Sequence, residues 1–102
     1  MMKLEFVVPC ETALQKAALD TLETALLKIA GGFSCYDGRG SWKSPNGVVF
    51  VERHTRFEIA SEPAWTGKLI RAFEKFGLDA GEHTLYMLRD GKPEFLMVRE
   101  AA

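Results

Sequence analysis

The segment VVFVERHTRFEI, from Val48 to Ile59, alternates between two kinds of side chain along its whole length. One face is mostly apolar and is interrupted only at Arg53; it consists of Val49, Val51, Thr55, Phe57 and Ile59. The other face is mostly polar and consists of Phe50, Glu52, His54, Arg56 and Glu58. A period of two residues is typical of a strand with one buried and one exposed face. The segment therefore predicts a half-buried strand in an antiparallel sheet.

A glycine-rich strand is expected just before this segment, over residues 33–42. The two are joined by a turn at Pro45-Asn46-Gly47, because proline fixes its first corner and Asn-Gly tolerates a positive φ. Gly38 and Gly40 flank Arg39 and indicate a bulge or the close approach of another backbone. They could also expose amides to a phosphate. The third glycine and following helix of a dinucleotide fingerprint are missing, however, so the bulge is favoured.

Two amphipathic helices are expected, one before and one after this pair of strands in the sequence. The first carries apolar residues at steps of three and four and ends at Gly31-Gly32; these residues are Leu14, Ala18, Leu22, Ala25, Leu26 and Ile29. The second begins with Ser61 as its cap, ends at Gly77, and repeats Trp65, Leu69, Phe73 and Phe76.

A first strand over residues 3–8 and a hairpin around Asp90-Gly91 complete the pattern. The resulting order is β-α-β-β-α-β with an additional C-terminal hairpin strand. This order predicts one ferredoxin-like α+β domain over residues 1–102, with two helices packed on one face of an antiparallel sheet.

Composition argues against several classes of partner. The formal net charge is -1, with 13 basic and 14 acidic residues, so no overall field favours nucleic acid or an anionic membrane. We see no signal peptide and no apolar run long enough to span a membrane. Cys10 and Cys35 have no CxxC spacing and no need to form a disulfide framework. A soluble, cytoplasmic protein is expected.

The candidate binding face is the side of the sheet that the helices leave open. We place on it Tyr36, Arg39, Trp42, Phe50, Glu52, His54 and Arg56. Exposed aromatic side chains on an uncovered sheet favour an interface with a partner. The charged row also has a plain structural explanation, because alternating charges on an exposed strand form cross-strand pairs.

Catalytic and metal-binding patterns are weak. Cys10 precedes a helix whose amides could make its thiol nucleophilic, but no histidine is adjacent in sequence and a small buried apolar residue is the favoured interpretation. Cys35 alternates with Phe33 and is expected in the core. The histidines and cysteines are scattered, so we expect no metal and no cofactor. The catalytic residues, if any, stay unassigned, and the pattern favours a protein that is not an enzyme.

Several local signals together resemble a group of small bacterial and phage proteins without an assigned activity. The signals are the Gly31-Gly32 helix end, the segment from Gly38 to Trp42, the Pro45-Asn46-Gly47 turn and a late Gly81-Glu82 before a short strand. The resemblance implies a ferredoxin-like α+β fold and brings no catalytic residue with it.

The sequence thus favours a small protein-interaction module, homodimeric through the open sheet face or bound to another protein. One alternative is a small-molecule-binding protein or enzyme of the dimeric α+β barrel type, with a pocket at the sheet face that uses His54 and Arg56. A second alternative, from the resemblance, is a phage accessory protein that inhibits a host factor.

Overall fold

The computed structural model describes residues 1–98, which form two helices and a five-stranded sheet. The elements in chain order are β1 (Met2–Pro9), α1 (Ala13–Ala30), β2 (Ser34–Lys43), β3 (Val49–Ser61), α2 (Pro63–Ala80), β4 (Thr84–Arg89) and β5 (Lys92–Met97). Residues 99–102 of the predicted domain lie outside the described part.

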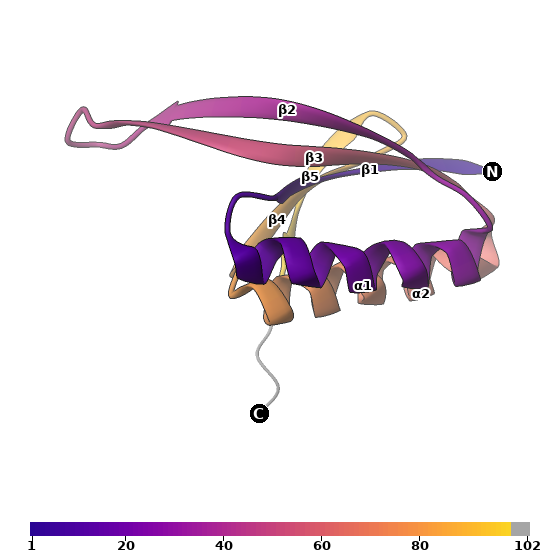
Figure 1. Cartoon of the computed structure of the whole chain (residues 1–102). Coiled ribbons are helices and arrows are strands. Elements are labelled where there is room, and N and C mark those ends of the chain that lie inside the picture. The colour runs from indigo at the N-terminus through magenta and orange to yellow at the C-terminus, as the bar shows by residue number, and fades with distance from the viewer. Residues whose placement is uncertain (99–102) are drawn as a thin grey trace.

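The sheet confirms the ferredoxin-like α+β arrangement. Its strand order is β2-β3-β1-β4-β5, and every neighbouring pair is antiparallel. The first four strands follow the split β-α-β order, and β5 extends the sheet beyond β4. Figure 1 shows α1 and α2 side by side beneath one face of the sheet. Neither α1 nor α2 lies over the opposite face, which we call the open face.

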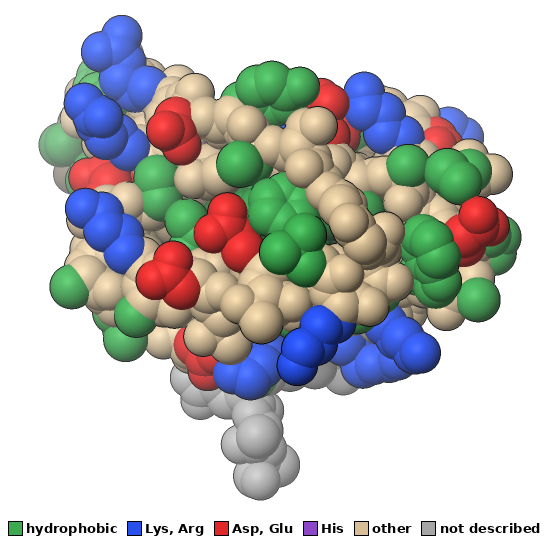
Figure 2. Space-filling model, turned by 45° about the vertical axis from the view of Figure 1, so that its right-hand side comes forward, with side chains coloured by type: hydrophobic (Ala, Val, Ile, Leu, Met, Phe, Trp, Pro, Cys, Tyr) green, Lys and Arg blue, Asp and Glu red, His purple; other side chains and the backbone are tan. Residues whose placement is uncertain are grey.

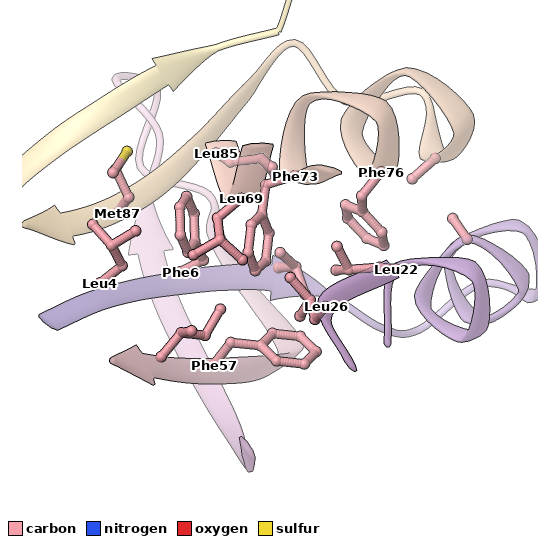
Figure 3. Packing of buried hydrophobic residues seen from close by; sticks show 14 of the residues in the cluster. Leu4, Phe6, Leu22, Leu26, Phe57, Leu69, Phe73, Phe76, Leu85 and Met87 are labelled. Atoms are coloured by element: carbon pink, nitrogen blue, oxygen red, sulfur yellow. The ribbon is translucent and has the colours of Figure 1, made fainter. Parts of the chain in front are cut away.

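The core lies between the helices and the sheet, as the alternation predicts. Leu4 and Phe6 of β1 lie opposite Ile59 and Phe57 of β3, and Leu69 and Phe73 of α2 belong to the same cluster (Figure 3). The rings of Phe6 and Phe73 stack with centroids 3.7 Å apart. Helix α1 adds Ala18, Leu22 and Leu26 to the same cluster. Because the core is built from one face of each strand, the side chains of the other face, many of them polar, remain on the open face.

The ends of the helices partly match the prediction. Helix α1 begins with a capping box at Thr12 and Gln15 and ends at Gly31, whose φ is 77°. The predicted end of α2 at Gly77 is wrong. The helix continues to Ala80 and is closed by Gly81. Gly77 is buried there, and a Cβ on it would overlap the side chain of Val98.

The cap of α2 also differs from the prediction. Ser61 belongs to β3, and Glu62 is the residue before the helix, without a side-chain cap. The Ser61 hydroxyl instead lies 3.0 Å from the hydroxyl of Thr66. Pro63 supplies the first helical residue, where its missing amide donor costs nothing.

Both predicted hairpins form. The turn after β2 closes with the Gly47 amide donating to the Ser44 carbonyl, and the turn after β4 places Asp90 and Gly91 at positive φ. The β2–β3 hairpin is the longer of the two and projects past the start of α1 (Figure 1). We call residues 39–53 the hairpin arm.

Candidate functional site

The register of β2 and β3 brings most of the predicted site residues onto the open face. Tyr36 pairs with Arg56, Gly38 with His54, Gly40 with Glu52, and Trp42 with Phe50. All of these side chains alternate with Thr55 and Phe57, which point to the core. The structure therefore gathers six of the predicted site residues on one surface, namely Tyr36, Trp42, Phe50, Glu52, His54 and Arg56.

Arg39 does not share this surface, so its predicted placement is wrong. It pairs directly with Arg53, which alternates in phase with Thr55 on the helix side of the sheet. The register is one-to-one along all of β2, so the predicted bulge at Gly38 and Gly40 is also absent. A bulge would have added a residue and shifted every later side chain to the other face.

The glycines have a different explanation, which is the position of the His54 ring. A Cβ on Gly38 would lie 2.5 Å from His54 Nε2, whereas a Cβ on Gly40 would lie 3.8 Å from His54 Nδ1. The imidazole therefore lies over β2 in space that any larger residue at position 38 would fill. Gly38 fixes where the ring can sit on the open face.

A hollow opens beside this ring, in the middle of the open face. Its volume is about 560 Å³, and it is lined by Val7, Pro9, Gly40, Trp42, Glu52, His54, Thr84, Leu85, Tyr86 and Phe95. Aromatic pairs stand at its two sides. Trp42 stacks with Phe50 at 5.6 Å between centroids, and Tyr86 meets Phe95 edge to face at 5.8 Å. The hollow is thus mostly apolar, with one carboxylate and one imidazole in its wall.

The carboxylate in that wall belongs to Glu52, and its surroundings disfavour its charge. Partial burial raises the pKa of Glu52, and the nearby Glu82 and Glu11 raise it further. Glu82 is held in place by Gln15, whose amide nitrogen donates to Glu82 Oε1 at 3.1 Å. Glu11 is held by β3, because the Arg53 amide donates to its Oε1 at 2.6 Å. The carboxylates of Glu11 and Glu82 thus lie near Glu52 at this end of the sheet, and of the three only Glu52 lines the hollow.

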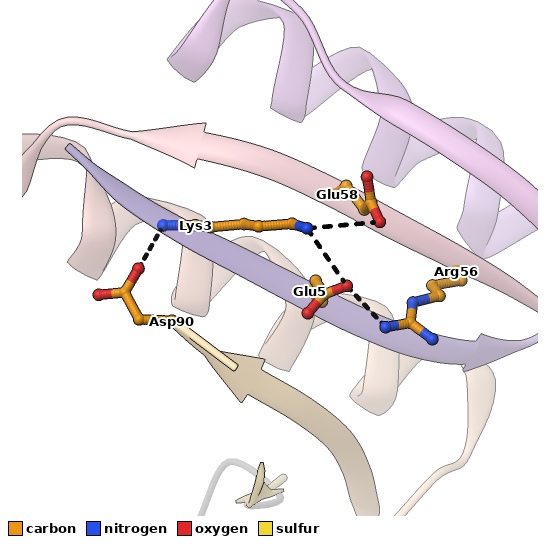
Figure 4. Close-up of polar contacts among 5 residues, drawn as sticks. All are labelled: Lys3, Glu5, Arg56, Glu58 and Asp90. Atoms are coloured by element: carbon orange, nitrogen blue, oxygen red, sulfur yellow. Dashed lines mark hydrogen bonds and ion pairs between the residues drawn. The ribbon is translucent and has the colours of Figure 1, made fainter. Parts of the chain in front are cut away.

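The other end of the open face is closed by an ion-pair network around Glu5 (Figure 4). Glu5 is only 5% exposed, although it lies on the uncovered side of β1. Its Oε1 accepts a hydrogen bond from Arg56 Nη2 at 2.6 Å, and Lys3 Nζ lies 3.9 Å away and also 3.8 Å from Glu58. The Glu5 hydrogen bond raises the pKa of Arg56. Arg56 therefore links β3 to β1 by its ion pair with Glu5, and it does not line the hollow.

The two cysteines lie away from the hollow. Cys35 pairs with Phe57 on the helix side but is exposed, so its predicted place in the core is wrong. Partial burial raises the pKa of its thiol, as do Glu23 and Asp37. Cys10 is half-buried and donates its amide to the Arg53 carbonyl. Higher thiol pKa values lower the thiolate fraction at neutral pH, so Cys35 is a poor nucleophile.

Sequence reasoning missed part of the site. Tyr86 and Phe95 come from the C-terminal hairpin and complete the hollow opposite Trp42. The alternation of Tyr86 with the buried Leu85 and Met87 is a signal that the sequence does contain. What the sequence does not contain is the pairing of β4 with β1, which brings them next to β3.

Comparison with known proteins shows the fold and not the activity. No family model and no curated protein matches the chain. Among solved structures, a phage SAM lyase in complex with S-methyl-5'-thioadenosine superposes with a TM-score of 0.63 at 15% identity, covering 99% of this chain and 92% of the lyase. CutA1 from Pyrococcus horikoshii OT3 superposes with a TM-score of 0.58 at 10% identity, covering 100% of this chain and 87% of that one.

These neighbours are similar-sized α+β proteins, and one of them comes from a phage. The resemblance to small bacterial and phage proteins is therefore confirmed at the level of the fold. In residues 1–98, neither helix combines the length and apolar character that a membrane crossing requires.

Proposed function

We propose that this protein is a small binding module that associates with copies of itself through the open sheet face. The observation that carries the proposal is the set of exposed aromatic side chains there, Trp42, Phe50, Tyr86 and Phe95. Phe95 is 71% exposed, and Met97 extends the same surface along β5. Apolar side chains gathered on an uncovered sheet are typical of a contact surface.

The charge distribution supports a protein partner. Figure 2 shows acidic, basic and hydrophobic side chains interspersed over much of the surface in that view, with Lys and Arg side chains gathered along its lower edge. A protein interface combines apolar anchors with such a mixed polar rim. The edges of the sheet, β2 and β5, also carry unpaired backbone groups that a second chain can use.

The test is the mass of the protein in solution as a function of concentration. Phe95→Glu places a charge on the open face and is expected to lower the average mass. Leu27→Glu is the matched control, because Leu27 is also an exposed apolar residue but lies on α1, away from the open face. Light scattering that reports a monomer for the parent protein at every concentration would contradict the proposal, as would equal masses for the parent and Phe95→Glu.

A second candidate function is the binding of a small molecule in the hollow. Its volume lies within the range of roughly 300–1,000 Å³ that ligand sites occupy, and its wall offers His54 and Glu52 as polar groups. The phage lyase that shares the fold was solved with a nucleoside thioether, so S-methyl-5'-thioadenosine is a reasonable first probe.

Calorimetric titration of that probe into the parent protein and into His54→Ala tests this second candidate. We expect binding to the parent and weaker binding to the variant. Equal binding to both would place the ligand elsewhere, and native mass spectrometry of protein purified from its own host would show whether another molecule is retained. The alternative of an inhibitor of a host factor stays a prediction.

A further inference from the structure

The hairpin arm exposes apolar side chains on both of its faces. Trp42 and Phe50 lie on the open face, whereas Val49 and Val51 lie on the helix side and are 61% and 57% exposed. Neither α1 nor α2 covers the second pair, because the arm extends past the start of α1 (Figure 1). A symmetric contact between two open faces would cover Trp42 and Phe50 but would leave both valines in water.

The helix side of the arm is also cationic. Arg39 and Arg53 are directly opposite each other, and Lys43 lies further along on the same face. Like charges in directly opposite positions destabilise a sheet. None of the ion pairs among residues 1–98 involves either arginine. We call this surface the underside of the arm; it consists of Arg39, Ser41, Lys43, Val49, Val51 and Arg53.

The hollow on the open face has the complementary character. Its walls are aromatic, and its carboxylate is that of Glu52, with Glu11 and Glu82 close enough to act on it. One surface of the chain is therefore apolar and positive, and another is apolar and negative. They lie on opposite sides of the sheet, so a single copy cannot bring them together.

We propose that the underside of the arm of one copy docks against the open-face hollow of a second copy, with Arg39 and Arg53 facing Glu52 of that copy. This inference rests on the proposed function, since it takes self-association through the open face and specifies what covers that face. The contact is heterologous, because it joins two different surfaces of the same chain. Repetition of such a contact closes into a ring or continues as a filament, depending on the rotation between copies.

Charge reversal separates this contact from a symmetric one. The double variant Arg39→Glu/Arg53→Glu gives both surfaces negative charge, and Glu52→Lys places a positive side chain in the hollow, where it would face the arginines of the arm. Each variant alone is expected to weaken association by roughly a hundredfold or more, because like charges would then face each other across the contact. Lys28→Glu/Lys68→Glu is the charge-matched control, since both lysines are exposed on the helices, and it should associate like the parent protein.

Mixing the two variants in equal amounts provides the decisive measurement. The negative arm then meets the positive side chain introduced at position 52, and the unchanged positive arm meets the unchanged Glu52, so mass photometry or sedimentation should show assemblies containing both variants. A circular dichroism spectrum like that of the parent shows that each variant is folded.

The outcomes distinguish this inference from the function on which it rests. A monomeric parent protein overturns both. A parent that associates while the charge variants associate equally well overturns only the arm-to-hollow contact. Variants that dissociate and are not restored by mixing also overturn it, and a small molecule retained in the hollow of the assembled parent would show that the arm is not the occupant.

Discussion

The position of the His54 ring makes a quantitative prediction about the two glycines beneath it. Neither Gly38 nor Gly40 has a positive φ, so both backbones accept alanine. Alanine at such a site stabilises a protein by about 0.4–1 kcal/mol, because it reduces the freedom of the unfolded chain. At position 40 the new methyl would be 3.8 Å from the ring, which is an ordinary contact, so Gly40→Ala should show the full gain.

At position 38 the same methyl would lie 2.5 Å from His54 Nε2, so the ring must move aside. Displacing a side chain from its preferred rotamer costs about 0.5–1.5 kcal/mol. We therefore expect Gly38→Ala to be less stable than Gly40→Ala by about that amount, as measured by urea unfolding at one fixed protein concentration. In a His54→Ala background the difference should disappear, because the obstructing ring is gone.

Comparing the glycine variants with and without the His54 side chain tests this explanation. If Gly38→Ala gains as much stability as Gly40→Ala while His54 is present, the ring does not require the glycine. If Gly38→Ala remains the less stable variant after His54 is removed, the cause lies in the backbone or in another neighbour.

Three further predictions concern the core and the charged groups. Gly77→Ala should destabilise the fold by up to about 2 kcal/mol. Overpacking against Val98 costs about 1–3 kcal/mol, and the gain in helix propensity offsets about 1 kcal/mol of that cost. Adding Val98→Ala to the same chain should remove the penalty, as measured by thermal unfolding. Arg56→Met should cost about 1–3 kcal/mol because it leaves the buried Glu5 carboxylate without its closest donor, and Glu5→Gln added to it should recover most of the loss in urea unfolding. The raised pKa of Glu52 means that the folded protein holds this proton more tightly than the unfolded chain, so its ionisation lowers stability as the pH rises through the acidic range; Glu52→Gln should therefore gain roughly 0.2–1 kcal/mol over the parent at pH 7 and nothing at pH 3, compared by urea midpoints in dilute protein.

The parts of the fold that could be predicted are those in which one short segment carries the whole signal. Alternation in β3 gave the correct faces, and the apolar spacing in α1 and α2 gave the correct buried stripes. Gly77 was misread because a glycine that ends a helix and a glycine that admits a neighbour look alike in sequence. Only the packed fold shows that Val98 occupies the space above it.

The site was predicted less completely because β2 lacks contrast between its faces. Aspartate, glycine, arginine, glycine and serine follow one another in its middle, so hydrophobicity does not mark the register there. Arg39 nevertheless has the same parity as Cys35, which the alternation with Phe33 places on the helix side. If odd-numbered and even-numbered residues of the strand are assigned to opposite faces, the sequence alone places Arg39 on the face opposite to Tyr36 and Trp42.

Alternation states which way a side chain points, but it does not state whether anything covers it. Strand β3 has 13 residues and α1 has 18, which correspond to roughly 43 Å of strand at about 3.3 Å per residue and roughly 27 Å of helix at about 1.5 Å per residue. The helices therefore run out before the strand does, and the buried side chains of β3 begin only at Thr55. Val49 and Val51 continue the same apolar pattern beyond that point, and within residues 1–98 no element covers them. Apolar side chains that continue a buried pattern onto an exposed surface are typical of a contact surface. The arm-to-hollow contact proposed above would cover them, and the length mismatch between strand and helix is the feature of the sequence that predicts such a surface.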